Sequence, residues 1–299
     1  MPSLVVLFAA LQLASLPCNP SLADQARRAF DQKNYQAAAD GFRLALDSCP
    51  QQPALGVELA RALLMARRFE EAEKAAREAV AANPRMVPAW LVLANTLYLI
   101  GKENQAERAF LRAIDLDPTN EDVLYSLGRV YYQQNRFELA VAQLQRVLAL
   151  NPMSYKAWDN LGLCYEALGR EDDAIRHFLK ALDLVYQDHR DYDWPYANLA
   201  NLLLKRGENE KAFQLASEAA VRNPASARNF FLTGKALSRL EKLDLAVKWL
   251  KQSIELDPAY PDPRYLLGQV FMKQGLQEAA QREFAAFEQV RVKAPRRRR

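Results

Sequence analysis

WLVLANTLYLIGKENQAERAFLRAIDLDP, residues 90–118, is one complete structural unit of this 299-residue chain. Its first half has apolar residues at helical spacing, at Trp90, Leu93, Ala94 and Leu97. Gly101 then predicts a helix end, because glycine adopts the left-handed cap conformation without strain. A second helix follows, with Ala106, Phe110 and Ala113 on its inner face. Pro118 closes it, since proline cannot donate the next helical hydrogen bond. One such helix pair cannot bury its apolar face alone, so it is expected to stack on similar neighbours.

The same unit recurs along the chain. Small residues of the second helix are spaced by 34 residues, with one interval of 38: Ala38, Ala72, Ala106, Ala140, Ala174, Ala212, Ala246 and Ala280. Twelve residues before each lies a small residue of the first helix: Ala26, Ala60, Ala94, Gly128, Gly162, Ala200, Gly234 and Gly268. Prolines keep this register at positions 50, 84, 118, 152, 224 and 258. Three independent positions share one period, which predicts eight repeats.

The repeat resembles the tetratricopeptide repeat. Two copies carry its pattern most fully, with Leu127-Gly128, Tyr131, Phe137, Ala140 and Pro152 in one, and Trp158, Leu161-Gly162, Tyr165, Ala174, Phe178 and Ala181 in the next. The resemblance implies an all-α fold, a right-handed α-solenoid of stacked helix–turn–helix repeats over residues 24–292. It is almost uninformative about the partner that is bound.

Two departures from the period stand out. Tyr186 replaces the proline of the fifth repeat and the next repeat arrives four residues late, so a four-residue insertion lies within residues 182–195. Four residues are about one helical turn, which predicts a lengthened second helix. The last repeat has Phe287 where a small residue is usual, and residues 293–299 form a basic tail that we expect to be disordered and solvated.

The amino terminus is predicted to be a signal peptide, residues 1–23. Leu4 to Leu16 is an uncharged run too short to span a bilayer, and the small residues Ser21 and Ala23 favour cleavage before Asp24. We therefore expect a protein exported to the periplasm or secreted, without a lipid anchor and without a transmembrane segment in the mature chain. The alternative is an ordinary first helix and a cytoplasmic protein.

No residues with the pattern of a catalytic or metal site stand out. His177 and His189 are isolated, and Gly234-Lys235 lacks the upstream glycine of a phosphate loop. The polar segment from Asp188 to Asp193 is interpreted as a linker, because it lacks the glycine turn and closing glutamate of a calcium loop. Cys49 and Cys164, the cysteines left after removal of residues 1–23, are too distant in a stacked fold to pair. We expect no enzymatic activity, no cofactor and no metal.

In proteins that these repeats resemble, the first helices line a concave groove that takes peptide segments. The corresponding positions in the first half are Arg61, Asn95, Tyr98, Tyr125, Arg129 and Tyr132. Tyrosine and arginine often anchor interfaces, and the three tyrosines are expected to form one exposed patch. The pattern for gripping a terminal carboxylate is incomplete, because Leu91 and Ser126 replace its lysine and second asparagine.

The second half of this groove is more cationic. Its positions are Asn201, Lys205, Phe231, Lys235 and Arg239. Such a surface favours an acidic segment of a partner protein. The net charge of the whole chain is only +4, and the basic tail lacks interleaved aromatics, so no nucleic acid is expected.

These features together predict a non-enzymatic scaffold that binds protein or peptide partners in an exported or envelope complex. Two alternatives stay open. One is a substrate-recruiting subunit of an enzyme complex, and the other is a cytoplasmic scaffold that keeps its amino-terminal segment.

Overall fold

The computed structural model describes residues 20–293, apart from the side chains at 187, 188 and 293, and these residues form sixteen helices and no strand. They divide into two compact units, residues 1–127 and 128–299. The first unit holds α1 (Pro20–Asp31), α2 (Tyr35–Ser48), α3 (Pro53–Met65), α4 (Phe69–Ala82), α5 (Val87–Leu99), α6 (Glu103–Leu116) and the start of α7 (Glu121–Gln133). The second holds the end of α7, then α8 (Phe137–Leu150), α9 (Tyr155–Ala167), α10 (Glu171–Asp188), α11 (Trp194–Arg206), α12 (Asn209–Arg222), α13 (Ala227–Arg239), α14 (Leu243–Leu256), α15 (Asp262–Lys273) and α16 (Gln277–Lys293).

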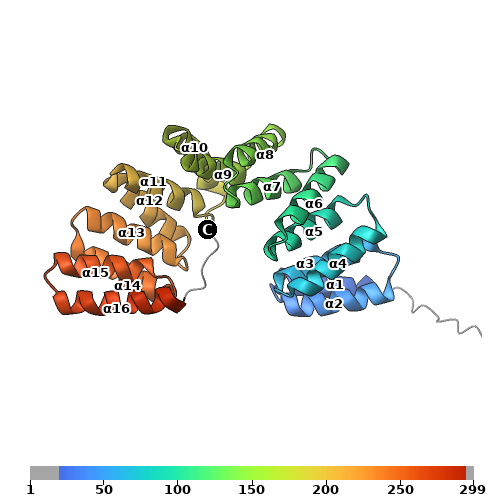
Figure 1. Cartoon of the computed structure of the whole chain (residues 1–299), viewed down its shortest axis with the longest axis horizontal. Coiled ribbons are helices and arrows are strands. Elements are labelled where there is room, and N and C mark those ends of the chain that lie inside the picture. Colours follow the sequence, from blue (N-terminus) through green and yellow to red (C-terminus); the bar gives the residue numbers. More distant parts are fainter. Residues whose placement is uncertain (1–19, 294–299) are drawn as a thin grey trace, which may run out of the picture. The chain divides into compact units, whose positions relative to one another are not determined.

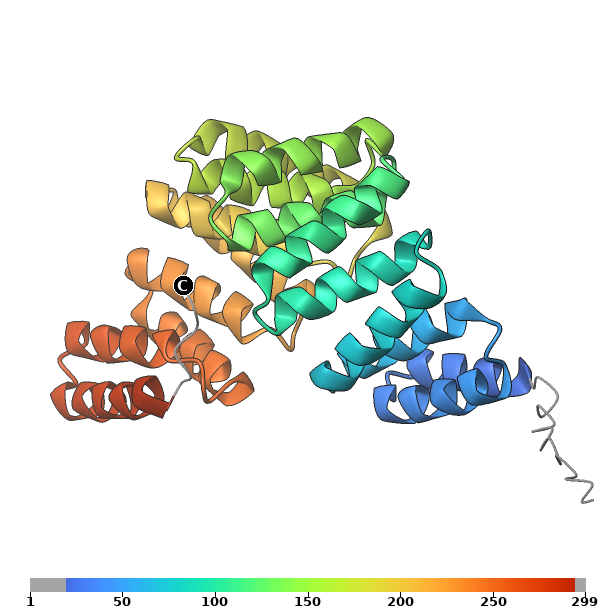
Figure 2. The same cartoon turned by 45° about the vertical axis from the view of Figure 1, so that its right-hand side comes forward.

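Successive helices pair into the eight predicted repeats, and within each unit the pairs stack side by side (Figures 1 and 2). Odd-numbered helices are the first helices of the repeats and even-numbered helices the second. The chain is therefore an all-α solenoid of stacked helix pairs, as the period predicts.

The turn inside each repeat contains one residue in the left-handed region. Four of these are glycines, including Gly101 at φ 79°, and the others are Lys33, Arg67, Asn135 and Glu241. They recur with the period of the repeat. A non-glycine residue there costs about 1–2 kcal/mol, so the stacking of the helix pair offsets local strain in half of the repeats.

Close approach of the paired helices depends on the small residues of the period. A Cβ added to Gly162 would lie 2.5 Å from the ring of Phe178, which is fully buried in the same repeat. A Cβ on Gly234 would likewise lie 2.8 Å from Leu250. The small residue on the first helix thus leaves room for the large side chain on the second, as expected from Ala94 and Phe110.

The tryptophans and prolines of the period are linked directly. The indole Nε1 of Trp90 donates to the carbonyl of Pro84 at 2.9 Å, and Trp158 donates in the same way to Pro152. Each proline ends one repeat and each tryptophan begins the first helix of the next. The indole therefore links the end of one repeat to the first helix of the next.

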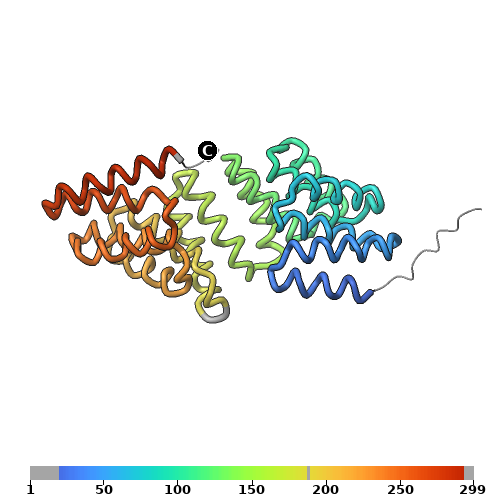
Figure 3. Tube along the Cα trace, turned by 90° about the horizontal axis from the view of Figure 1, so that it is seen from below, coloured from blue at the N-terminus to red at the C-terminus, as the bar shows by residue number. Residues whose placement is uncertain are grey.

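The insertion lengthens a helix, as predicted. Second helices α2, α4, α6, α8, α12 and α14 each have 14 residues, whereas α10 has 18. The extra turn carries Tyr186 and is followed by a short loop before α11; Figure 3 gives a second view of this region along the chain trace.

The ends of the solenoid differ slightly from the predicted limits. The first helix begins at Pro20, and Ala23 is buried, so cleavage before Asp24 would remove the first turn of α1. The last helix includes Lys293, the first residue of the predicted tail. Residues 1–19 of the predicted signal peptide and residues 294–299 of the tail lie outside the described part of the chain.

Cys49 does not pair with Cys164, as expected, although Cys49 is itself buried and disulfide-bonded. That expectation counted only the two cysteines left after removal of residues 1–23. Cys164 is free and buried, as expected, so the partner of Cys49 lies outside the described residues. Burial raises the pKa of the Cys164 thiol to about 12, which makes it a poor nucleophile.

Candidate partner-binding surfaces

In the first unit, Arg61 on α3 lies beside a cavity of about 220 Å³ on the face of the first helices. Its guanidinium carbon is 5.5 Å from the centre of the Phe30 ring, a cation–π distance. Arg27 of α1 donates to both carboxylate oxygens of Glu58 on α3, at 3.1 to 3.3 Å. Arg61 is exposed and has no ion pair with any described residue. The assignment of Arg61 to a partner-binding groove stays a prediction.

The other predicted residues of this unit are less exposed than expected. Asn95 and Tyr98 on α5 and Tyr125 on α7 are half-buried, and both tyrosines interact within the chain. Leu99 is 57 % exposed and Met65 is 47 % exposed. The prediction of an exposed tyrosine patch is therefore wrong for this unit, because the tyrosine rings pack into the stack. Aliphatic side chains supply the exposed apolar surface instead.

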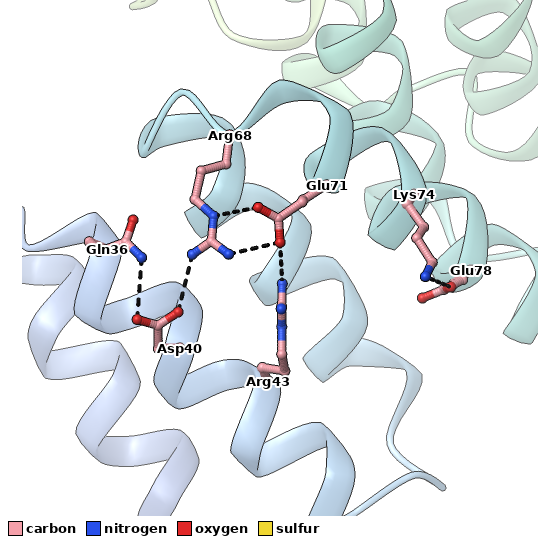
Figure 4. Close-up of polar contacts among 7 residues, drawn as sticks. All are labelled: Gln36, Asp40, Arg43, Arg68, Glu71, Lys74 and Glu78. Carbon is pink, nitrogen blue, oxygen red and sulfur yellow. Dashed lines mark hydrogen bonds and ion pairs between the residues drawn. The ribbon is translucent and has the colours of Figure 1, made fainter.

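The outer side of this unit is held by a chain of ion pairs between consecutive second helices (Figure 4). Arg68 contacts Asp40 of α2 at 3.1 Å and Glu71 of α4 at 2.7 Å, and Arg43 contacts Glu71 at 2.8 Å. Hydrogen bonds from Arg68 and Arg43 lower the pKa of Glu71 to about 2. These charges satisfy one another, so this surface serves to join two repeats.

In the second unit, a buried carboxylate lies beneath the face of the first helices. Asp159 on α9 is 2 % exposed and accepts a hydrogen bond from Asn198 Nδ2 of α11 at 2.9 Å. The Oδ1 atom of Asn198 in turn accepts from Arg228 of α13 at 2.9 Å. The chain Asp159–Asn198–Arg228 thus connects three consecutive first helices.

Burial raises the pKa of Asp159 to about 7, far above its ordinary value. The hydrogen bond from Asn198, the charge of Arg228 and the hydroxyl of Tyr192 oppose this rise, and the charge of Asp193 adds to it. Desolvation is the largest of these effects, as expected for a carboxylate removed from water without a direct ion pair.

The loop that follows the extra turn of α10 is built into the same network. Asp193 is 5 % exposed and accepts from Asn229 of α13 at 2.6 Å and from Asn223 at 3.3 Å. Asn229 also donates to the carbonyl of Ala219 at 2.9 Å. The segment interpreted from the sequence as a solvated linker therefore ends in a buried carboxylate that joins repeats six and seven.

The loop also makes aromatic contacts. The ring of Tyr155 on α9 lies 4.3 Å from His189 and 4.7 Å from Tyr192, measured between centroids. The described residues contain no group of three or more side chains that could hold a metal ion. His177 stacks between Trp158 and Tyr165, and its Nδ1 is 2.7 Å from the carbonyl of Asp173. Both histidines thus serve packing.

The predicted cationic residues of this unit separate into paired and unpaired charges. Lys205 is paired with Glu166 at 2.7 Å. Arg228, Lys235 and Arg239 lie along α13 and form no ion pair with the described carboxylates, and Arg239 donates to the carbonyl of Leu204. Burial lowers the pKa of Lys235; the charges of Arg239 and Lys205 add to this effect, and the charge of Asp262 opposes it. The stripe on α13 is therefore positively charged and forms no direct ion pair with the described carboxylates, although the charges of Asp159 and Asp193 stabilise Arg228 and that of Asp262 stabilises Lys235.

Two adjoining cavities lie beside this stripe. One has a volume of about 360 Å³ and the other about 510 Å³, and Lys235, Leu266 and Gln269 line both. Phe231 lines the first, with its ring 5.4 Å from that of Tyr260 and 5.8 Å from the Lys235 ammonium. The remaining lining side chains are Asp262, Tyr265 and Phe287 in the first cavity, and Ser238, Arg239, Met272, Lys273 and Phe284 in the second.

The other predicted residues of this unit are peripheral to these cavities. Arg129 is exposed and interacts within the chain, and Asn201 is half-buried. Tyr132 is half-buried, with its ring 5.6 Å from Phe137, and burial raises its pKa. The sequence reasoning missed Asp159 and Asn198 as parts of the surface, although both stand in first helices close to the predicted groove positions.

Family models identify the fold independently. A model of the tetratricopeptide repeat matches residues 57–121 and 125–189, and a second TPR model matches residues 234–275. Together these matches cover more than half of the chain, which therefore belongs to the tetratricopeptide-repeat family. No curated protein sequence is significantly similar to the chain.

Solved structures share this fold at low sequence identity. A chain of the APC/C hetero-tetramer Cut9–Hcn1 is 18 % identical with a TM-score of 0.67, over 84 % of this chain and 52 % of that chain. PilF of Pseudomonas aeruginosa is 24 % identical with a TM-score of 0.62, over 73 % of this chain and 97 % of the PilF chain. A tetratricopeptide repeat protein of Parabacteroides merdae is 17 % identical with a TM-score of 0.63, over 88 % of this chain and 98 % of that chain. The chain spans about half the length of the Cut9–Hcn1 chain, and these likenesses show the fold alone. None of the described helices has the length and apolar character needed to cross a membrane.

Proposed function

We propose that this protein is a non-enzymatic scaffold that binds acidic segments of partner proteins on the first-helix face of its second unit. The observation that carries the proposal is the stripe of Arg228, Lys235 and Arg239 on α13, which forms no direct ion pair with the described carboxylates. Keeping these cations together costs repulsion and desolvation, which a negatively charged ligand would relieve.

The adjoining cavities give such a ligand something besides charge. Lys235 lies between an aromatic wall that includes Phe231 and a second cavity reached by Arg239. A segment with acidic residues next to a large apolar side chain fits both features. Charge complementarity would speed association at low salt and weaken as salt rises.

Export is part of the proposal. The uncharged run at the amino terminus and the small residues Ser21 and Ala23 support it. Sequencing the amino terminus of the native protein tests this part: a start at Met1 argues against a cleaved signal peptide.

The binding surface is tested with the double variant Lys235→Glu, Arg239→Glu. The wild-type protein is expected to capture partners identified by mass spectrometry, and the variant to lose at least the acidic ones. A matched control is Lys248→Glu with Lys251→Glu, which makes the same charge change at exposed positions on the second helix α14. Equal capture by both double variants and the wild type would refute the assignment of this face.

A further inference from the structure

The two adjoining cavities beside α13 form one groove with two different ends. The groove lies between the neighbouring first helices α13 and α15 (Figure 1). Phe231 and Tyr265, from the first halves of these helices, line the first cavity. Arg239 and Lys273, the last residues of the same helices, line the second. The character of the groove therefore changes along the helix axes, from aromatic to cationic.

The first cavity is an aromatic pocket. Phe231 and Tyr265 are 34 residues apart, so they occupy the same position in consecutive repeats. Tyr265 is 46 % exposed, and its ring lies 5.2 Å from that of Phe287. The two charged side chains that line this cavity, Lys235 and Asp262, have opposite signs. A large apolar or aromatic side chain of a ligand fits this end of the groove, whereas an added charge gains little there.

The ring of Phe287 is particular to the last repeat. The corresponding positions in the other seven second helices carry buried alanine, valine or serine: Ala45, Ala79, Ala113, Val147, Ala181, Ala219 and Ser253. Phe287 is half-buried and lines the first cavity. The helix pair does not require so large a side chain here, because seven repeats pack without one. The additional ring enlarges the apolar surface that a ligand can cover.

The second cavity is cationic. Lys235, Arg239 and Lys273 line it, and no carboxylate of the described residues does. Lys273 is paired with Glu241 at 2.8 Å, whereas Lys235 and Arg239 form no ion pair with the described carboxylates. Arg239 donates to the carbonyl of Leu204, and a guanidinium has further N–H groups for a ligand. A ligand carboxylate in this cavity would lie close to both cations and gain charge-assisted hydrogen bonds.

The separation of the two cavities sets the spacing of the ligand. Phe231, Lys235 and Arg239 follow one another at intervals of four residues on α13. Each cavity therefore occupies about one helical turn, and their centres lie about 6 Å apart. In an extended chain, side chains two residues apart point to the same side and are about 6.6 Å apart. The groove thus matches an extended segment whose apolar and acidic residues are two positions apart.

The side chain between the two cavities favours an extended ligand over a helical one. Gln269 of α15 is exposed and lines both cavities. Its carboxamide carries a donor and an acceptor, which are the partners that a peptide group requires. An extended segment presents its N–H and C=O groups to the groove, whereas a helix keeps them within its own hydrogen bonds. A helix would need residues four apart to reach both cavities, so the spacing distinguishes the two forms.

We propose that the groove between α13 and α15 binds an extended segment of a partner protein in which one residue separates a large apolar residue from an acidic residue. The aromatic pocket takes the apolar side chain, and Lys235 and Arg239 hold the carboxylate. This inference rests on the proposed function and adds to it a second anchor, a spacing and an extended conformation. An acidic segment without the apolar residue fills only one cavity and binds more weakly.

The probes are short fluorescent peptides of glycine and serine that carry one phenylalanine and one glutamate. Binding to the full-length protein is measured by fluorescence anisotropy. Peptides with Phe-Ser-Glu and Glu-Ser-Phe test the two chain directions. Comparison peptides have alanine in place of phenylalanine, the two residues adjacent, or the two residues at the helical spacing of four. At least one of the first two peptides is expected to bind about tenfold more tightly than its alanine version, because phenylalanine buries a large apolar surface.

Variants of the protein separate the two anchors. Tyr265→Ala is expected to weaken binding of the phenylalanine peptide about fivefold and to leave the alanine peptide unchanged, because only the former uses the aromatic pocket. Tyr186→Ala is the matched control, since Tyr186 is an exposed tyrosine on the second helix α10 and lies outside the groove. Circular dichroism checks that both variants remain folded. Gln269→Ala removes the exposed carboxamide and is expected to weaken binding of all peptides that fill both cavities.

The outcomes distinguish this inference from the proposed function. Equal binding of the phenylalanine and alanine peptides would overturn the inference, and the proposed function would stand if Lys235→Glu with Arg239→Glu still abolished binding. The tightest binding at the helical spacing would also overturn it, because the ligand would then be a helix. Binding of the acidic peptides to that double variant as tightly as to the wild type would instead refute the proposed function. Failure of every peptide to bind the wild type would contradict both.

Discussion

Replacing Asp159 with asparagine tests the buried network of the second unit most directly. The substitution keeps the shape of the side chain and a carbonyl oxygen that can accept from Asn198, but it removes the charge. The pKa of Asp159 rises from its ordinary value of 3.8 to about 7 in the folded protein, chiefly through burial. The folded protein therefore binds a proton more tightly than the unfolded chain does, and deprotonation at high pH favours unfolding.

The size of the effect follows from that difference. About three pKa units at 1.36 kcal/mol each give about 4 kcal/mol lost between pH 4 and pH 7, as an upper limit. The sign is opposite to that of an ion-paired carboxylate: stability is highest when Asp159 is protonated and falls as pH rises through the folded pKa. Between pH 5 and pH 7 the wild type should lose up to about 3 kcal/mol relative to Asp159→Asn.

The assay is urea unfolding of both proteins at pH 5, 6, 7 and 8, together with amide exchange of α9 and α11. Exchange is needed because stacked repeats can open separately. Taking the difference between the two proteins cancels the titration of groups that they share. A difference that is the same at pH 5 and pH 8 would refute the reasoning, because Asp159 would then not titrate in this range.

Three further predictions follow from particular contacts. Gly162→Ala places a Cβ 2.5 Å from the Phe178 ring, so it should lower the free energy of unfolding in urea by about 1–3 kcal/mol. Adding Phe178→Leu to this variant should restore part of the loss. Unchanged stability of Gly162→Ala would show that the pair is not tightly packed. Asn229→Ala leaves the buried carboxylate of Asp193 without its 2.6 Å donor, so it should lower the free energy of unfolding by about 3 kcal/mol. Amide exchange at the start of α11 should become faster. Unchanged exchange there would contradict the role given to Asn229. Glu71→Gln should lower the melting temperature at pH 7 but not near pH 2. Arg68 and Arg43 lower the pKa of Glu71 to about 2, so the stabilisation is lost as pH falls through that value. An equal change in melting temperature at both pH values would exclude an electrostatic cause.

The repeat architecture could be predicted from the sequence because its determinants are local. The spacing of Ala94, Ala106 and Phe110 specifies a helix pair whose two members lie close together, and the same spacing recurs in every repeat. The extra turn of α10 could be predicted as well, because a helix can absorb four residues without breaking its apolar face. Each of these inferences uses residues less than one repeat apart.

The buried network could not be predicted in the same way. Asp159 stands on a helix where a carboxylate ordinarily faces water, and it is buried by Tyr192, Asn198 and Arg228, which lie 33 to 69 residues further along. Tertiary packing determines the environment of Asp159, and the residue pattern of α9 alone does not indicate that this carboxylate is buried. The prediction of an exposed tyrosine patch was wrong for the same reason. The exposure of these tyrosines depends on how neighbouring repeats pack, which helical periodicity does not specify.

The insertion contributes contacts on both sides of the second unit. On the outer side, the extra turn adds the exposed side chain of Tyr186 to α10. On the inner side, the loop that follows it brings Tyr192 to Asp159 and Asp193 to Asn229, beside the cations of α13. Partner specificity in this solenoid should therefore depend on side chains that the period leaves free to vary, and the variant at Lys235 acts on such a position rather than on the stack.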